Sequence, residues 1–117
     1  MVKVYAFDVD HTLEVSGGPV TLKSMMDLRV EGHIVGVCGN MGVFCAIPGW
    51  QHLSSFLGQG LVPKDLFLAN LKENIQAEEH VMVGNIIGVS GASDDQGAAR
   101  RSGWRFIKES DFAAGAR

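Results

Sequence analysis

The chain has 117 residues, 46% of them hydrophobic and 20% charged, which fits a single globular domain over residues 1–117. Its formal net charge of −3 excludes a polybasic surface and argues against nucleic acid as the main partner. No apolar run reaches membrane-spanning length and the N-terminus lacks the layout of a signal peptide, so we expect a cytoplasmic protein with no membrane partner. Cys38 and Cys45 have no zinc-ligand spacing, and we expect both to be reduced.

Apolar runs and turn residues alternate along the chain in the pattern of strands followed by helices. This alternation predicts an α/β fold, with a central, mostly parallel sheet covered by helices on both faces. The predicted elements, in chain order, are a strand at 2–8, a helix at 19–31, a strand at 33–38, a short helix that ends at Gly58, a short edge strand at Leu61–Val62, a helix that Asp65 caps and that runs to about Ile75, a strand at 80–83, a helix at 95–102 and a strand at 104–107.

Two carboxylates, Asp8 and Asp10, follow directly on the first predicted strand. Acidic side chains are tolerated only where such a buried strand ends at water, so we expect both in a cleft. Ligands of open α/β sheets bind beyond the carboxyl ends of the strands. The pair therefore predicts a metal site, or a nucleophile with an acid/base partner.

The string from Asp8 to Leu13 resembles the first motif of the haloacid dehalogenase (HAD) superfamily. The resemblance implies a three-layer α/β/α, Rossmann-like domain and a Mg²⁺-dependent phosphohydrolase, or phosphatase, that works through an aspartyl-phosphate. In that mechanism Asp8 is the nucleophile and Asp10 the general acid and base. Thr12, behind them, is assigned to binding of the phosphate.

The second motif of the family places a hydroxyl residue at the end of the next strand, often followed by Gly-Asn. Here the triplet is Cys38-Gly39-Asn40, so the position matches while the hydroxyl is absent. A thiol is only a weak hydrogen-bond donor. The main-chain N–H groups of Gly39 and Asn40 can supply part of the phosphate contact, and a buried cysteine acting as a small hydrophobic residue is the competing interpretation of Cys38.

The third motif is a lysine that neutralises the phosphoryl oxygens and the nucleophile. Lys64 stands where the family has this lysine, although the proline that usually follows it is absent. Lys72 is the alternative, but it falls mid-helix on a face expected to be solvated.

The fourth motif supplies metal ligands after a later strand. Asn85 replaces its usual aspartate, and Asp94 or Asp95 at the start of the next helix provides the second acid. The resemblance thus implies a Mg²⁺ site made from Asp8, Asp10, Asn85 and one of these two acids. A neutral amide should hold Mg²⁺ less tightly than a carboxylate does.

Many family members carry an inserted cap domain, and this chain is too short between its motifs to hold one. A capless, open site suits a phosphorylated substrate that brings its own bulk, such as a phosphoprotein, a nucleic-acid end or a lipid-linked sugar. It also suits a homo-oligomer in which a neighbour acts as the lid.

Two alternatives come from other functional classes. Cys38 and Asn85 fit a catalytically weak or inactive HAD-like domain that acts as a binding or regulatory module. A phosphoacceptor receiver domain has a similar length, but it places its lysine near the end of the chain. Lys64 precedes the strand at 80–83 here, which disfavours the receiver.

Overall fold

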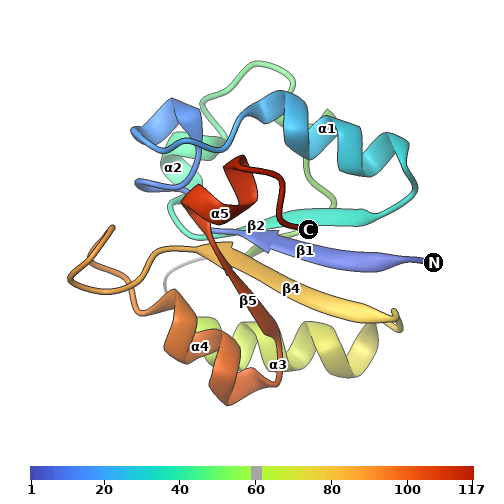
Figure 1. Ribbon diagram of the computed structural model, residues 1–117. Helices are drawn as coiled ribbons and strands as arrows, with labels where there is room; N and C mark the ends of the chain where they lie inside the picture. Colours follow the sequence, from blue (N-terminus) through green and yellow to red (C-terminus); the bar gives the residue numbers. More distant parts are fainter. Residues whose placement is uncertain (59–61) are drawn as a thin grey trace.

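A computed structural model describes residues 1–58 and 62–117. Its elements in chain order are β1 (Lys3–Phe7), α1 (Leu22–Val30), β2 (Ile34–Cys38), α2 (Met41–Phe44), β3 (Leu57–Gly58), α3 (Lys64–Asn74), β4 (Glu79–Gly84), α4 (Asp95–Ser102), β5 (Arg105–Lys108) and α5 (Glu109–Ala113). The described strands form one sheet in the order β3-β2-β1-β4-β5, and every pairing is parallel. Helices α1, α2 and α5 cover one face, and α3 and α4 cover the other (Figure 1). The three-layer α/β/α architecture predicted from the sequence is confirmed.

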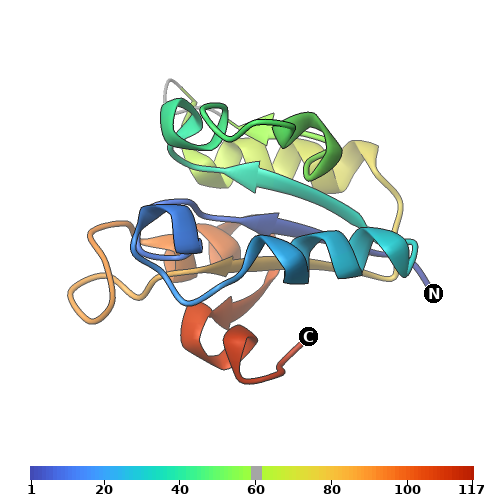
Figure 2. The ribbon, with the colours of Figure 1, turned by 90° about the horizontal axis from the view of Figure 1, so that it is seen from above.

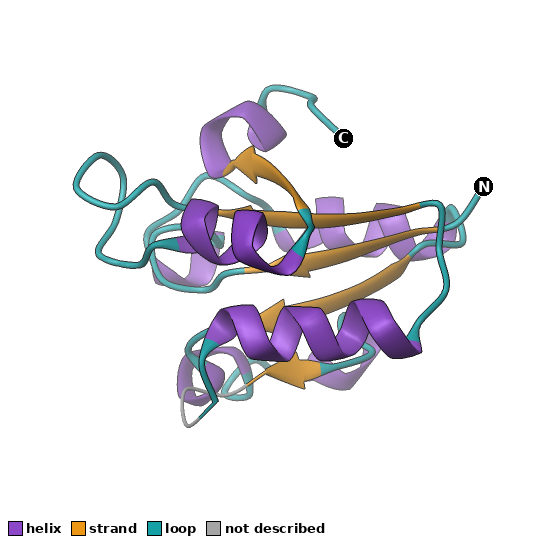
Figure 3. Cartoon of the chain, turned by 90° about the horizontal axis from the view of Figure 1, so that it is seen from below, coloured by secondary structure: helices purple, strands orange, loops and turns teal. Residues whose placement is uncertain are grey.

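The central strand β1 is buried on both faces, because alternate side chains enter the two helical layers. Tyr5 and Phe7 pack in one core with Phe112 of α5, whose ring meets that of Phe7 edge to face at 5.2 Å. Figure 2 shows this layer from above, with α1 and α5 over the sheet. Ala6 belongs to the other core, which lies between the sheet and helices α3 and α4 and in which the Trp104 indole donates a hydrogen bond to the Leu68 carbonyl at 2.8 Å. Figure 3 shows these two helices in front of the sheet.

The strand order reverses at β1, which places a crevice at the carboxyl edge of the sheet. The chain runs from β1 to β2 and β3 on one side and then crosses to β4 on the other side. Phe7 at the end of β1 is in register with Val83 near the end of β4. Asp8 and Asn85, which follow these strands, therefore emerge at the switch point where open α/β sheets bind ligands.

The segment before residue 59 differs from the prediction. Instead of one short helix that ends at Gly58, a 3₁₀ turn spans Trp50–His52 and Leu57–Gly58 form the edge strand β3. Gly58 pairs with Cys38 and lies so close to the Phe67 ring that a β-carbon would come within 2.4 Å of it. This pairing, which sequence spacing does not reveal, overrides the helical pattern. Of the predicted strand Leu61–Val62, Leu61 lies outside the described residues and Val62 is exposed in a bend.

Two helix starts also differ from the prediction. Helix α1 begins only at Leu22, because Val20 forms a bridge with Leu13 and Thr21 is the N-cap. At α3 the N-cap position is Pro63, and Asp65 lies within the first turn, where it accepts a hydrogen bond from Arg101 at 3.0 Å. The short helices α2 and α5 were not predicted, since four or five residues are too few to show helical periodicity.

The stretch between β1 and α1 contains a 3₁₀ turn at Glu14–Ser16 and the bridge to Val20, with no inserted domain among the described residues. No helix in the described part of the chain is long and apolar enough to cross a membrane.

Candidate active site

An ion-paired group of three side chains lies at the carboxyl edge of the sheet. Asp8 follows β1, while Lys64 and Asp95 are the first residues of α3 and α4. The Lys64 ammonium lies 2.8 Å from Asp8 Oδ1 and 2.6 Å from Asp95 Oδ1. Both carboxylates are almost fully buried, and the lysine side chain is 24% exposed. The fold thus joins the predicted first-, third- and fourth-motif residues through one cation.

Burial and mutual charge set the ionisation of this group. Burial raises the pKa of Asp8 to about 6, with the Lys64 charge opposing the rise and the Asp95 charge adding to it. For Lys64, burial lowers the pKa, but the attraction of Asp8 and Asp95 outweighs burial and the net shift is upward. Asp8 is therefore mostly a carboxylate, and Lys64 an ammonium, at neutral pH.

The surroundings of Asp8 fix its carboxylate from two further sides. The Thr12 hydroxyl, fully buried, donates a hydrogen bond to Asp8 Oδ2 at 3.3 Å. Gly39 lies so near that a β-carbon there would come within 2.7 Å of Asp8 Oδ1. Thr12 thus contacts the predicted nucleophile itself, and a glycine at 39 keeps the space beside it open.

Asp10 lies in a more polar setting than Asp8. Its carboxylate accepts hydrogen bonds from Ser16 Oγ at 2.7 Å and from Asn40 Nδ2 at 3.2 and 3.3 Å. The Ser16 hydrogen bond is the main reason that the pKa of Asp10 is lowered. Asn40 Oδ1 in turn caps α2 through the N–H of Val43. The Asn40 side chain is therefore turned toward Asp10.

Cys38 ends β2 with its side chain almost fully buried. Burial raises the pKa of its thiol to about 12, so the thiol is neutral at physiological pH. It behaves as a small, weakly polar wall of the site rather than as a nucleophile.

Asn85, at the position where the resembled HAD motif has an aspartate, directs its polar groups to Asp95, His11 and Glu109. Its main-chain N–H donates to Asp95 Oδ2 at 2.9 Å, which orients that carboxylate. Its side-chain amide donates to the His11 carbonyl at 3.1 Å and to Glu109 Oε2 at 3.3 Å. Glu109 also accepts from Ser90 Oγ at 3.2 Å and so ties the loop after β4 to α5.

Sequence reasoning missed Glu109 and Ser16. Glu109 is 4% exposed, and a signal for it existed, because it follows the last predicted strand and must emerge at the same sheet edge as Asp8. Ser16 carries no such signal, since its contact with Asp10 depends on the fold of the 3₁₀ turn.

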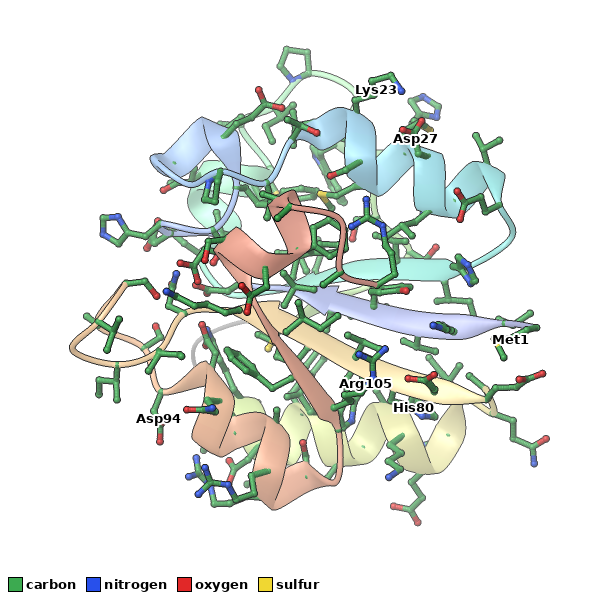
Figure 4. The ribbon with its side chains drawn as sticks, viewed as in Figure 1. Met1, Lys23, Asp27, His80, Asp94 and Arg105 are labelled. Atoms are coloured by element: carbon green, nitrogen blue, oxygen red, sulfur yellow. The ribbon has the colours of Figure 1, made fainter. Side chains whose placement is uncertain are left out.

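Asp94 is not part of the site. Its carboxylate caps α4 by accepting from Gly97 N at 3.0 Å, and it lies 3.6 Å from Arg101 on the exposed side of the helix (Figure 4). Lys72, the alternative to Lys64, donates to the Gly103 carbonyl at 2.7 Å, away from Asp8. Of the alternatives left open, the structure joins Asp95 and Lys64 to Asp8.

A cavity of about 430 Å³ opens between these groups. The residues that line it are Asp8, Asp10, Cys38, Gly39, Asn40, Met41, Gly58, Lys64 and Ser93. A larger hollow of about 610 Å³ is lined by Lys72, His80 and Arg105 among others (Figure 4 labels His80 and Arg105). Of the residues considered for the site, it contains only Lys72, the alternative to Lys64. Within residues 1–58 and 62–117, no three Asp, Glu, His or Cys side chains are grouped so that they could hold a metal ion.

Comparisons of the chain with models of protein families, with curated proteins and with solved structures find no match.

Proposed function

We propose that the chain is a Mg²⁺-dependent phosphohydrolase that acts through an aspartyl-phosphate on Asp8. The observation that carries the proposal is a buried carboxylate, paired with a lysine at 2.8 Å, at the wall of a 430 Å³ cavity. Paired ions of perturbed pKa in such a cavity are typical of catalytic sites. The resemblance of Asp8 to Leu13 to the first HAD motif supplies the reaction class.

In the proposed reaction, an oxygen of Asp8 attacks phosphorus, an Asp8–phosphoryl bond forms, and the bond to the leaving oxygen breaks. Thr12 and Lys64 hold the attacking carboxylate in place through their contacts with its two oxygens. The ammonium of Lys64 also opposes the negative charge that gathers on the phosphoryl oxygens. Water then displaces the phosphoryl group and regenerates Asp8.

Asp10 is the proposed general acid and base. It protonates the leaving oxygen in the first step and takes a proton from water in the second. Its lowered pKa leaves it ionised at neutral pH, which suits the second step. A bound phosphate dianion raises the pKa of a neighbouring carboxyl by like-charge repulsion, and this favours the protonated form that the first step needs.

The net negative charge of the carboxylates at the site suits a divalent cation such as Mg²⁺. The carboxylates of Asp8, Asp10 and Asp95 exceed the charge of Lys64 by two, and Mg²⁺ prefers oxygen ligands that are charged. Because no three such side chains are grouped for a metal ion in the described residues, we propose that Asp8, Asp10, Asp95 and Asn85 would have to draw together to hold the ion. When bound, it would reduce the repulsion between the carboxylates and an anionic substrate.

The Asn85→Asp variant, which restores the aspartate of the HAD motif, is expected to have a lower free energy of unfolding than the wild type unless Mg²⁺ is present. The Asn85 side chain donates to Glu109 at 3.3 Å, so Asn85→Asp sets two carboxylates against each other. Like-charge repulsion at this distance is worth about 1–4 kcal/mol at effective dielectrics between water and a protein surface. The free energy of unfolding from urea titrations, with and without Mg²⁺, measures the loss.

The double variant Asn85→Asp/Glu109→Gln is the control, because it removes one of the two facing charges. It should regain most of the lost stability in the absence of Mg²⁺. An Asn85→Asp variant as stable as the wild type without Mg²⁺ would contradict this account of the Asn85–Glu109 contact.

One observation favours a second candidate, a catalytically weak or inactive domain that binds a ligand. Lys64 engages both Asp8 and Asp95, and Asn85 directs its amide to Glu109, so these groups are already satisfied within the protein. Such a domain would still bind phosphate-containing ligands beside Lys64 without turning them over.

Hydrolysis of a generic aryl phosphate and of a panel of phosphorylated metabolites distinguishes the two candidates. The phosphohydrolase predicts phosphate release that requires millimolar Mg²⁺ and stops on chelation by EDTA. Folded protein that releases no phosphate at any Mg²⁺ concentration would favour the binding module.

A further inference from the structure

Resting on the phosphohydrolase proposed above, we infer a substrate class: phosphate monoesters whose organic group is neutral or cationic. Esters that carry a second anionic group, including nucleic-acid ends and bisphosphates, are rejected. The inference comes from the charges around the cavity and from the side chains that complete its wall.

The cavity has one cation among its described lining residues, and that cation is already engaged. The Lys64 ammonium is shared between Asp8 at 2.8 Å and Asp95 at 2.6 Å, and Asp10 adds a further carboxylate to the wall. These groups carry a formal charge of −2, which one divalent cation balances. The phosphoryl dianion of the substrate then restores a charge of −2, and a second anion meets only repulsion.

The rest of the described cavity wall supplies no compensating charge. Its remaining members are neutral side chains and glycines, namely Cys38, Gly39, Asn40, Met41, Gly58 and Ser93. Neutral groups thus complete the described wall of the cavity beside Asp8, Asp10 and Lys64.

The volume of about 430 Å³ is enough for a phosphate ester with a ring-sized organic group. A polyanionic strand is disfavoured here by the same charges, in agreement with the net charge of −3 of the whole chain. Among the bulky substrates that an open site admits, the charge of the cavity therefore favours phosphate esters whose organic group is uncharged or cationic.

Two esters of nearly equal size test the inference. The probes are 4-carbamoylphenyl phosphate, whose amide is neutral, and 4-carboxyphenyl phosphate, whose carboxylate is ionised at pH 7.5. We expect kcat/KM for the neutral ester to exceed that for the anionic ester by about tenfold or more at low salt. The ratio should shrink as ionic strength rises, because salt screens repulsion between exposed charges.

A positive charge added to the cavity wall tests whether charge causes the preference for the neutral ester. Met41→Lys adds a cation to the cavity, and Met41→Gln is its neutral control. The lysine variant should lower the ratio of the two kcat/KM values severalfold, and the glutamine variant should leave that ratio near the wild-type value. Lowering of the ratio by both variants alike would attribute the selectivity to shape and overturn the inference.

The two proposals fail in different ways. Equal kcat/KM values for the two esters, or a preference for the anionic ester, would overturn the substrate class and leave the phosphohydrolase intact. Absence of Mg²⁺-dependent hydrolysis of both esters would overturn the phosphohydrolase and this inference with it.

Discussion

The Asp8→Asn variant is expected to lose all Mg²⁺-dependent phosphate release while it keeps its fold. An amide is a poor nucleophile toward phosphorus, so the first step of the proposed reaction cannot occur. The fold should persist, because Lys64 keeps its contact with Asp95 and the new amide retains an oxygen that can accept from Thr12. Steady-state phosphate release and circular dichroism on the same samples measure both halves of this prediction.

Asp94→Asn provides the matched control, since it makes the same chemical change at a residue far from Asp8 in the sequence. Asp94 immediately precedes Asp95. Asp94 caps α4 outside the site, and asparagine is as good an N-cap as aspartate. Its activity should stay within about twofold of the wild type, since surface changes away from such contacts have small effects. Activity retained by Asp8→Asn would remove Asp8 from the role of nucleophile.

Strong local patterns made most of the fold predictable. The strand before Asp8 and the helix that ends before Gly103 depend on patterns of neighbouring residues in the sequence. The structure has both within a residue or two of their expected bounds. The edge strand at Leu57–Gly58 was missed, because two residues carry no period of their own and are held by pairing with Val37 and Cys38.

The candidate site was predictable where its residues follow strands or begin helices. Asp8 and Lys64 were named from the sequence, and the parallel sheet explains why residues 56 positions apart meet at one edge. The choice between Asp94 and Asp95 could not be made, since it depends on which of two adjacent side chains caps α4.

Lys64→Met is expected to cost more stability than any other single change to the site, about 3–5 kcal/mol of unfolding free energy. The change leaves Asp8 and Asp95 buried close together with no cation between them. Small domains have only about 5–15 kcal/mol in total, so the loss should be plain in urea titrations. Lys72→Met, which removes an exposed ammonium on the same helix, should cost within about 1 kcal/mol.

The double variant Lys64→Met/Asp95→Asn separates charge from packing. Removing one of the two stranded carboxylates should restore part of the lost stability, and the new amide oxygen at position 95 can still accept from the Asn85 N–H. A double variant less stable than Lys64→Met alone would show that the lysine stabilises the site by packing, not by balancing charge.

The most direct test of the central claim is to look for the phosphoryl group on the protein itself. Wild-type protein is mixed with Mg²⁺ and an excess of an ester that it hydrolyses, and the reaction is quenched in acid during turnover. The protein is then digested, and its peptides are mapped by mass spectrometry. The account predicts one added phosphoryl group on the peptide that contains Asp8, and none in the Asp8→Asn variant. Steady turnover with no such adduct in samples quenched from milliseconds to minutes, or an adduct on another residue, would contradict it.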